Sequence, residues 1–181
     1  MNNKIRFTAV ATFILGTRAY DAYSTALYTP DLSMEANPLV SQLGMGWTSL
    51  LLTIGLLTLG SLYAYHRALF SNHSIEPSEK GMSFKQYATY VYLGHTDQWS
   101  AFMYKFPKSL KRFTHFMGHY FIPALSFAGV VSTLMWLGIK YTSFYPPIHS
   151  LTLVYSILVG GAILVSGQKM YKNYAAYKAR V

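Results

Sequence analysis

The chain has 181 residues, of which 52% are hydrophobic, 17% are aromatic and only 12% are charged. Soluble domains have about a quarter of their residues charged, so this composition excludes an ordinary water-soluble protein. The formal net charge is +9, and the lack of cysteine excludes a disulfide, a thiolate metal site and a cysteine nucleophile.

Four segments that are nearly free of charge predict an all-α protein. A helix needs about 20 apolar residues to cross a bilayer, and each segment approaches or exceeds that length. Buried helices of a soluble protein would show a polar outer face, which these segments lack. We therefore expect one integral membrane domain over residues 1–181, built as a bundle of four transmembrane helices. The expected spans are 7–28, 47–66, 113–138 and 150–168.

The first span carries a polar stripe on an otherwise apolar helix. Arg18, Asp21 and Thr25 follow one another at spacings of three and four, which places them on one helix face. The helix should end before Pro30, which cannot continue it without losing a hydrogen bond. Asn37, followed by a proline, has the form of a helix start. It predicts a short re-entrant or interfacial helix before the second span.

The insert 71–112 separates the second and third spans. Apolar positions recur at helical spacing over residues 83–93, and Gly94 follows as a terminator. Thr96 or Asp97 is expected to cap a second short helix. Both are expected to be amphipathic cytoplasmic helices, either lying on the inner leaflet or docking another subunit.

The distribution of basic residues predicts the orientation. Lysine and arginine gather before the first span, in the insert and after the fourth span, whereas the opposite loops carry Asp31 and Glu35 with a single lysine, Lys140. By the positive-inside rule, both termini are expected to be cytoplasmic, in a bacterial inner membrane. The membrane topology thereby explains the excess of basic residues, and we expect no nucleic-acid partner.

The polar stripe and the loop after it form the first candidate site, and two interpretations stay open. Carboxylates, an amide and hydroxyls suit a cation, while the helix start at Pro38 offers N–H groups to an anion. Alternatively, Arg18 only pairs with Asp21, and the loop residues only brace the loop. The candidate ligand- or ion-binding residues are Arg18, Asp21, Thr25, Glu35 and Asn37, with a lining completed by Thr152, Tyr155 and Ser156 of the fourth span.

Histidines form the second candidate site. His115 and His119 are four residues apart at the inner end of the third span, and His66 ends the second span on the same side. Such a set can bind a transition metal or haem. No glutamate follows His115, so the HExxH signature of metalloproteases is absent. The other interpretation is that these are solvated histidines at the lipid headgroups.

A basic run in the insert is expected to attract anionic lipid headgroups. It comprises Lys105, Lys108, Lys111 and Arg112. A P-loop, a GxGxxG fingerprint and a GxSxG elbow are absent from the sequence, which argues against the enzyme classes that depend on them.

Asp21 and Thr25, followed by the run Glu35-Ala-Asn-Pro38, resemble a motif of small bacterial multi-span membrane proteins of unknown function, the DUF5658 type. Those proteins have an aspartate and a threonine in one span and then a Glu-x-Asn-Pro element. The similarity covers about residues 17–45. It implies that these positions define the family, and it supplies no activity. The long insert and the tyrosine-rich tail depart from the compact pattern.

The leading functional hypothesis is a small accessory subunit of a membrane complex, associated with the bilayer and with other subunits or with itself. Its polar cluster would stabilise the packing of the helices or bind a ligand. The alternative is a membrane enzyme or transporter in which Asp21 and Glu35 bind a cation or a proton. A third interpretation is metal or haem binding at His115 and His119.

Overall fold

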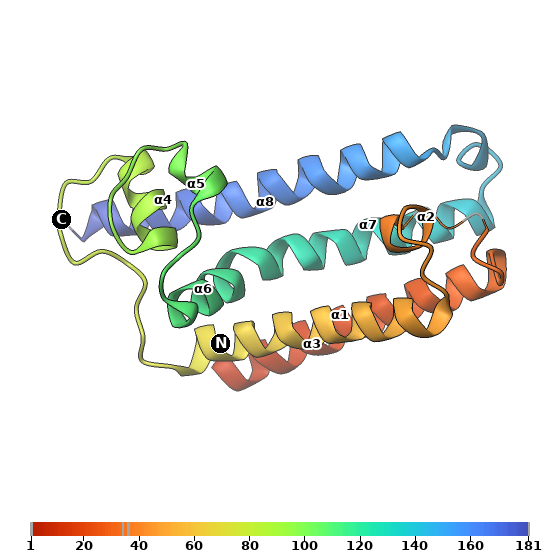
Figure 1. Ribbon diagram of the computed structural model, residues 1–181, viewed down its shortest axis with the longest axis horizontal. Helices are drawn as coiled ribbons and strands as arrows, with labels where there is room; N and C mark the ends of the chain where they lie inside the picture. Colours follow the sequence, from red (N-terminus) through yellow and green to blue (C-terminus); the bar gives the residue numbers. More distant parts are fainter. Residues whose placement is uncertain (1, 34, 36, 181) are drawn as a thin grey trace. The chain divides into compact units, whose positions relative to one another are not determined.

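The structure is a computed structural model that describes residues 2–33, 35 and 37–180, so Ala36 of the Glu35–Pro38 element lies outside it. Within these ranges the regular elements are helices, and no strand occurs (Figure 1). The expected all-α class is confirmed.

In the part of the chain that the structure describes, three helices are long and apolar enough to cross a membrane. The first is α3 (Trp47–Phe70), and the last is α8 (Leu151–Ala179). The middle one is a continuous helix over Leu110–Tyr141, made of α6 (Leu110–Phe116), the π-helical segment η1 (Met117–Phe121) and α7 (Ile122–Tyr141). These three helices indicate an integral membrane protein, because each carries an apolar stretch of the length that a bilayer requires.

Helix α1 (Asn3–Tyr28) is not among these three, although its 26 residues span about 39 Å at 1.5 Å per residue. It is less apolar than the others because it carries Lys4, Arg6, Arg18 and Asp21. The expected helix is present, and that it crosses the membrane is proposed below.

The helices extend beyond the expected limits of the spans. The second runs to Phe70 rather than 66, the third begins at Leu110 rather than 113, and the fourth continues to Ala179 rather than 168. The Ser109 hydroxyl accepts a hydrogen bond from the Arg112 N–H at 3.3 Å, which caps α6 three residues early. Apolar length sets the limits of a span, but lysine, tyrosine and alanine also continue a helix beyond it.

The chain divides into two compact units. Unit 1 comprises the residues up to Gly60 together with Leu125–Ala162, and unit 2 comprises Ser61–Ala124 and the chain from Ile163 onward. Unit 1 therefore holds α1, the short helix α2 (Pro38–Ser41), the first part of α3, most of α7, the 3-10 turn η2 (Pro146–Ile148) and the start of α8.

Close packing of α1 against α7 in unit 1 depends on a glycine. A Cβ added at Gly129 of α7 would lie 2.5 Å from the Thr17 hydroxyl of α1. The Thr17 hydroxyl itself donates to the Ile14 carbonyl at 3.0 Å, so it is satisfied within its own helix. Small residues at such crossings let helix backbones approach closely in lipid.

Unit 2 has a compact aromatic core around α4 (Phe84–Leu93). The helix begins at Ser83 with a capping box to Gln86 and ends at Gly94, which has φ +93°. Its buried face meets the end of α8: Tyr87 is fully buried, and its ring centroid lies 5.2 Å from that of Tyr177. The predicted amphipathic helix is confirmed, and its apolar face is covered by the chain's own tail.

The second short helix differs from the expectation. Helix α5 (Ala101–Tyr104) begins after Ser100, without a side-chain cap, so the expectation that Thr96 or Asp97 caps it is wrong. Asp97 instead accepts a hydrogen bond from the Lys105 Nζ at 2.7 Å. The Lys105 ammonium holds the pKa of that carboxyl below its usual range, since it stabilises the charged form.

Candidate functional site

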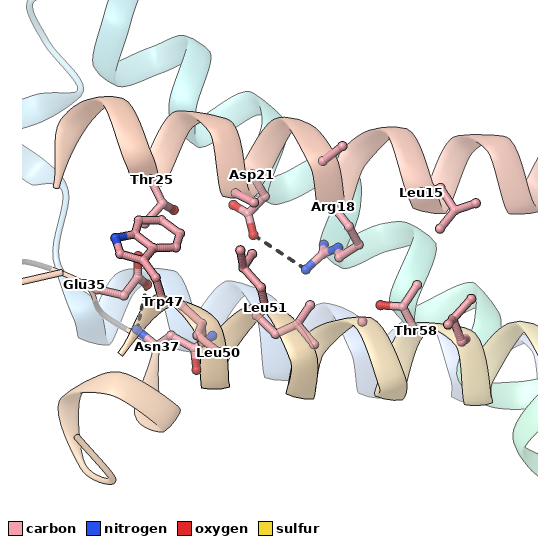
Figure 2. A pocket seen from close by; sticks show the side chains of 15 residues that line it. Leu15, Arg18, Asp21, Thr25, Glu35, Asn37, Trp47, Leu50, Leu51 and Thr58 are labelled. Atoms are coloured by element: carbon pink, nitrogen blue, oxygen red, sulfur yellow. Dashed lines mark hydrogen bonds and ion pairs between the residues drawn. The ribbon is translucent and has the colours of Figure 1, made fainter. Parts of the chain in front are cut away.

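Helix α1 presents three of the predicted site residues on one face, and Figure 2 shows the side chains of Arg18, Asp21 and Thr25 pointing toward α3 within unit 1. Thr25 is 7% exposed and the neighbouring Ser24 is 4% exposed. This part of the polar stripe is therefore turned toward other elements of unit 1.

Asp21 is held by two donors from α7. Its Oδ1 accepts hydrogen bonds from the Ser132 hydroxyl and from the Trp136 Nε1, the latter at 2.9 Å. Its Oδ2 lies 3.7 Å from Nη1 of Arg18, which confirms the predicted ion pair. Sequence reasoning missed Ser132 and Trp136, although two hydrogen-bonding residues four apart within an apolar span were a signal that could have found them.

The loop after α1 is fixed by its own hydrogen bonds. The Asn37 side chain accepts from the Leu39 N–H at 3.0 Å and so caps α2, as predicted. The Asn37 N–H donates to Glu35 Oε1 at 2.9 Å. The Trp47 Nε1 donates to the Pro30 carbonyl at 2.7 Å, which ties the start of α3 to the loop. The bracing role that we considered for Glu35 and Asn37 is confirmed by these contacts.

Two cavities meet at this cluster, and both are lined by residues of unit 1. Cavity 1 has a volume of about 370 Å³ and lies between α1 and α3 (Figure 2). Cavity 2 has a volume of about 190 Å³ and is bounded by α1, α7 and α8. The structure brings all five predicted residues into the lining of both cavities: Arg18, Asp21, Thr25, Glu35 and Asn37.

Arg18 has one edge of its guanidinium without a partner. Its Nε and Nη2 atoms are buried and form no hydrogen bond within the described residues, while Nη1 faces Asp21. The N–H groups of Nε and Nη2 point the same way from the planar group, and such a fork binds a carboxylate or a phosphate with two parallel hydrogen bonds. Because a buried donor without a partner is costly, this edge has a strong tendency to bind an oxyanion.

The contribution expected from the fourth span is only partly present. Tyr155 lines cavity 2. Thr152 and Ser156 are exposed and line neither of the two cavities, so that expectation is wrong for both. Tyr155 and Ser156 lie about 100° apart around an α-helix, so a neighbour that receives one side chain does not receive the other.

The histidines of unit 2 are not gathered as the second candidate site requires. His115 is fully buried, and its Nε2 lies 2.8 Å from the Ser71 hydroxyl, so the interpretation as a solvated histidine is wrong for this residue. His66 packs on Phe70, with ring centroids 4.6 Å apart. His119 lines a separate cavity of about 290 Å³ in the same unit. Across residues 2–33, 35 and 37–180, no three histidine or acidic side chains are grouped to hold a metal ion.

The buried His115 also contacts a histidine that the sequence pattern did not single out. The ring of His73 meets that of His115 edge to face, at a centroid distance of 5.0 Å. Burial, together with the positive charges of Lys111 and Arg112, lowers the pKa of His73 below its usual range. Two members of the basic run thus act on a buried part of unit 2.

Arg112 serves the fold of unit 2 directly. Its Nη1 donates to the carbonyl oxygens of Ile75 at 3.1 Å and of Tyr90 at 3.0 Å. Its guanidinium also lies over the Tyr90 ring, 5.3 Å from the centroid. Of the four basic residues expected to attract anionic lipid, Arg112 is engaged with the backbone and Lys105 with Asp97, whereas Lys108 and Lys111 are exposed.

The helices and the polar cavities define a helical integral membrane protein with a candidate binding site in unit 1. No family model, curated protein or solved structure matches the chain. The resemblance to the DUF5658 type therefore stays a prediction.

Proposed function

We propose that this chain is a small accessory protein of a membrane, and that the cluster around Arg18 and Asp21 holds a ligand. The observation that carries the proposal is the convergence of five polar residues, from α1 and from the loop after it, on the two cavities of unit 1. In a membrane protein, ionisable side chains inside a span usually mark a binding site or an internal pair. Here one internal pair exists, and the free edge of Arg18 remains beyond it.

The proposed arrangement has four spans, with α1 crossing beside the three apolar helices and both termini in the cytoplasm of a bacterium. The polar cluster then lies toward the opposite side of the membrane. The exposed apolar and aromatic side chains of the long helices would contact lipid and neighbouring subunits, or a second copy of the chain. Lys108 and Lys111 would contribute attraction to anionic headgroups, at about 1 kcal/mol per charge near a membrane surface.

The competing function is proton or cation transport through Asp21 and Glu35. Both carboxylate oxygens of Asp21 are already engaged, Oδ1 with two donors from α7 and Oδ2 with Arg18. This favours a positioning role for Asp21, which keeps Arg18 in place, over a role as a proton carrier.

Purification of the full chain in a mild detergent tests the proposal. We expect a stable assembly larger than one chain, with a bound organic molecule that mass spectrometry detects. Asp21→Asn should reduce the amount of that molecule, because it weakens the partner that positions Arg18, while Lys4→Gln should leave it unchanged. A chain that purifies alone and empty, and that shows ion- or pH-dependent transport abolished by Asp21→Asn and Glu35→Gln, would support the competing function instead.

A further inference from the structure

Cavity 1 changes in chemical character along its length. Along α1 its lining passes from Thr25 through Asp21 and Arg18 to Leu15 (Figure 2). Figure 2 shows Glu35, Asn37 and Trp47 at the Thr25 end and Leu15 at the other. Because the α-helix rises 1.5 Å per residue, Thr25 and Arg18 are separated by about 10 Å along the axis. The cavity therefore has a polar end, a middle with the Arg18–Asp21 ion pair, and a mainly apolar end at which Thr58 is the polar residue that Figure 2 labels.

The middle of the cavity offers a phosphate-binding group. The unpartnered Nε and Nη2 of Arg18 form a fork that matches two oxygens of a phosphate. Asp21 faces the opposite part of the guanidinium through Nη1 and is itself fixed by α7, so it holds the fork in orientation without occupying it.

The polar end offers a site for a cation. Within the described residues, the Glu35 carboxylate accepts a hydrogen bond from the Asn37 N–H at its Oε1 and has no cationic partner there, so its charge is available. The ring of Trp47 is immobilised by the bond from its Nε1 to the Pro30 carbonyl. A carboxylate and a fixed indole that line the same end of a cavity suit an ammonium group, through charge and through the face of the ring.

The apolar end offers a path for a hydrocarbon chain. Gly55 and Leu59 of α3 also line the cavity, and Figure 2 places Thr58 of the same helix near Leu15. Leu15 and Leu59 are also exposed at the surface of the unit, so a chain in this path would continue into the surrounding lipid. The volume of about 370 Å³ suits a head and the first part of a chain, since small-molecule sites have volumes of roughly 300–1,000 Å³.

We propose that cavity 1 binds a phospholipid whose head carries one phosphate and one ammonium group. The phosphate binds the free edge of Arg18, the ammonium lies toward Glu35 and Trp47, and the acyl chain follows the apolar wall beyond Leu15. The order of groups in such a lipid, ammonium then phosphate then chain, is the order of the cavity. A purely anionic head would leave Glu35 uncompensated. This assignment rests on the proposed ligand-holding function and names the class of ligand.

The test measures the change in tryptophan fluorescence when lipids are added to the full-length protein in detergent, since Trp47 lies at the end of the cavity that would receive the ammonium group. The probes are a lysophosphatidylethanolamine, a lysophosphatidylglycerol, which has the phosphate but no ammonium, and a long-chain alcohol with neither. We expect the first to bind tightest and the alcohol weakest. Trp47→Phe should remove most of the fluorescence change, because Trp47 lines cavity 1, whereas Trp136 lines only cavity 2 and Trp99 lines neither.

Variants separate the two charges of the head. Arg18→Gln should weaken both phosphate lipids about tenfold or more, the loss expected for two hydrogen bonds to a charged group. Arg18→Lys, which keeps the charge but not the fork, should recover part of that loss. Glu35→Gln should weaken the binding of the zwitterionic lipid only, so that the affinities of the two phosphate lipids come within about twofold of each other. Lys4→Gln, which changes the net charge equally outside the cavity, should bind as the wild type does.

Three results would overturn the assignment. The first is that a folded Arg18→Gln or Arg18→Lys variant binds the two phosphate lipids as tightly as the wild type does. The second is that Glu35→Gln still binds the ammonium lipid more tightly than the phosphatidylglycerol analogue. The third is that the wild type binds the alcohol as tightly as it binds the phosphate lipids. Free phosphoethanolamine, added without a chain, should bind more weakly than the lysolipid, and equal binding would show that the apolar wall contributes nothing. If the wild type binds none of the probes and purifies empty, the ligand-holding function fails as well.

Discussion

Gly118 is a residue at which α3 and the Leu110–Tyr141 helix approach each other closely in unit 2. A Cβ there would lie 2.2 Å from the Ala64 carbonyl oxygen and 2.7 Å from the Ala68 Cβ. The contact is with backbone, which cannot move aside as a flexible side chain can. Gly118 itself lies within the π-helical segment η1, and such segments interrupt the regular side-chain register of a helix.

We therefore expect Gly118→Ala to destabilise the protein by about 1–3 kcal/mol, the usual cost of inserting a methyl group into a packed interface. The measurement is the midpoint of thermal unfolding in detergent. Gly167→Ala is the matched control, because a Cβ at Gly167 meets no atom within 4 Å. Equal midpoints for the two variants would show that α3 does not pack against η1 in this way.

His73 makes a second prediction at the residue scale, which concerns pH. Its pKa is lowered by burial and by the nearby Lys111 and Arg112, so the folded protein binds a proton here less readily than the unfolded chain does. Stability should therefore fall as the pH drops below about 6.5, the usual pKa of histidine, toward the lowered pKa of the folded state. His73→Gln should flatten this pH dependence. The unfolding midpoint is measured between about pH 5 and pH 7.5, a range that includes the usual histidine pKa of about 6.5. The same slope in both proteins would contradict the prediction.

Helix α4 shows how element limits follow from local chemistry. Gln86 Oε1 accepts hydrogen bonds from the Ser83 N–H and hydroxyl, each at 2.9 Å, and the Ser83 Oγ accepts from the Gln86 N–H at 3.4 Å. At the other end Gly94 adopts a left-handed conformation with φ +93°. These are interactions between neighbours in the sequence, which is why the sequence predicted this helix and its end.

Ser83→Ala should cost about 1 kcal/mol, the typical value for losing an N-cap side chain, and should raise hydrogen exchange of the first amides of α4. Ser100→Ala offers the control, because Ser100 precedes α5 without a capping hydrogen bond from its side chain. Exchange measured by mass spectrometry on both variants checks the prediction. An equal increase in both would mean that the capping box does not stabilise α4.

Which segment covers the apolar face of α4 could not be predicted from neighbouring residues. Its apolar face was expected to meet a membrane surface or a partner, and the tail of α8 occupies it instead. The Tyr177 hydroxyl donates to the Glu79 carbonyl at 2.7 Å and accepts from the Met82 N–H at 3.2 Å, so it ties the tail to the loop before α4. These contacts join residues more than 90 positions apart, and periodicity carries no information about such distant partners.

At the scale of the whole molecule, the number of spans decides the orientation of the site. Four spans place both termini on one side and the loop with Asp31 on the other. If α1 does not cross, Asn3 and Asp31 lie on the same side. The chain has no cysteine, so single cysteines introduced at chosen positions give an unambiguous signal.

We expect Asn3→Cys and Lys178→Cys to react with a membrane-impermeant thiol reagent only from the cytoplasmic side, and Asp31→Cys only from the opposite side. The expectation follows from the excess of lysine and arginine near both termini and in the insert. Labelling of intact and opened cells measures it. Reaction of Asn3→Cys and Asp31→Cys from the same side would leave three spans.

The sequence by itself predicted the helices and five of the residues that line the candidate site. Apolar length predicted the long helices, Asn37 and Gly94 predicted where short helices begin and end, and the spacing of Arg18, Asp21 and Thr25 predicted a shared face, because each depends on neighbours in the chain. Only the tertiary structure decided what those residues meet. The bonds from Ser132 and Trp136 to Asp21, the free edge of Arg18 and the burial of His115 arise where distant helices pack, and no local pattern specifies that packing.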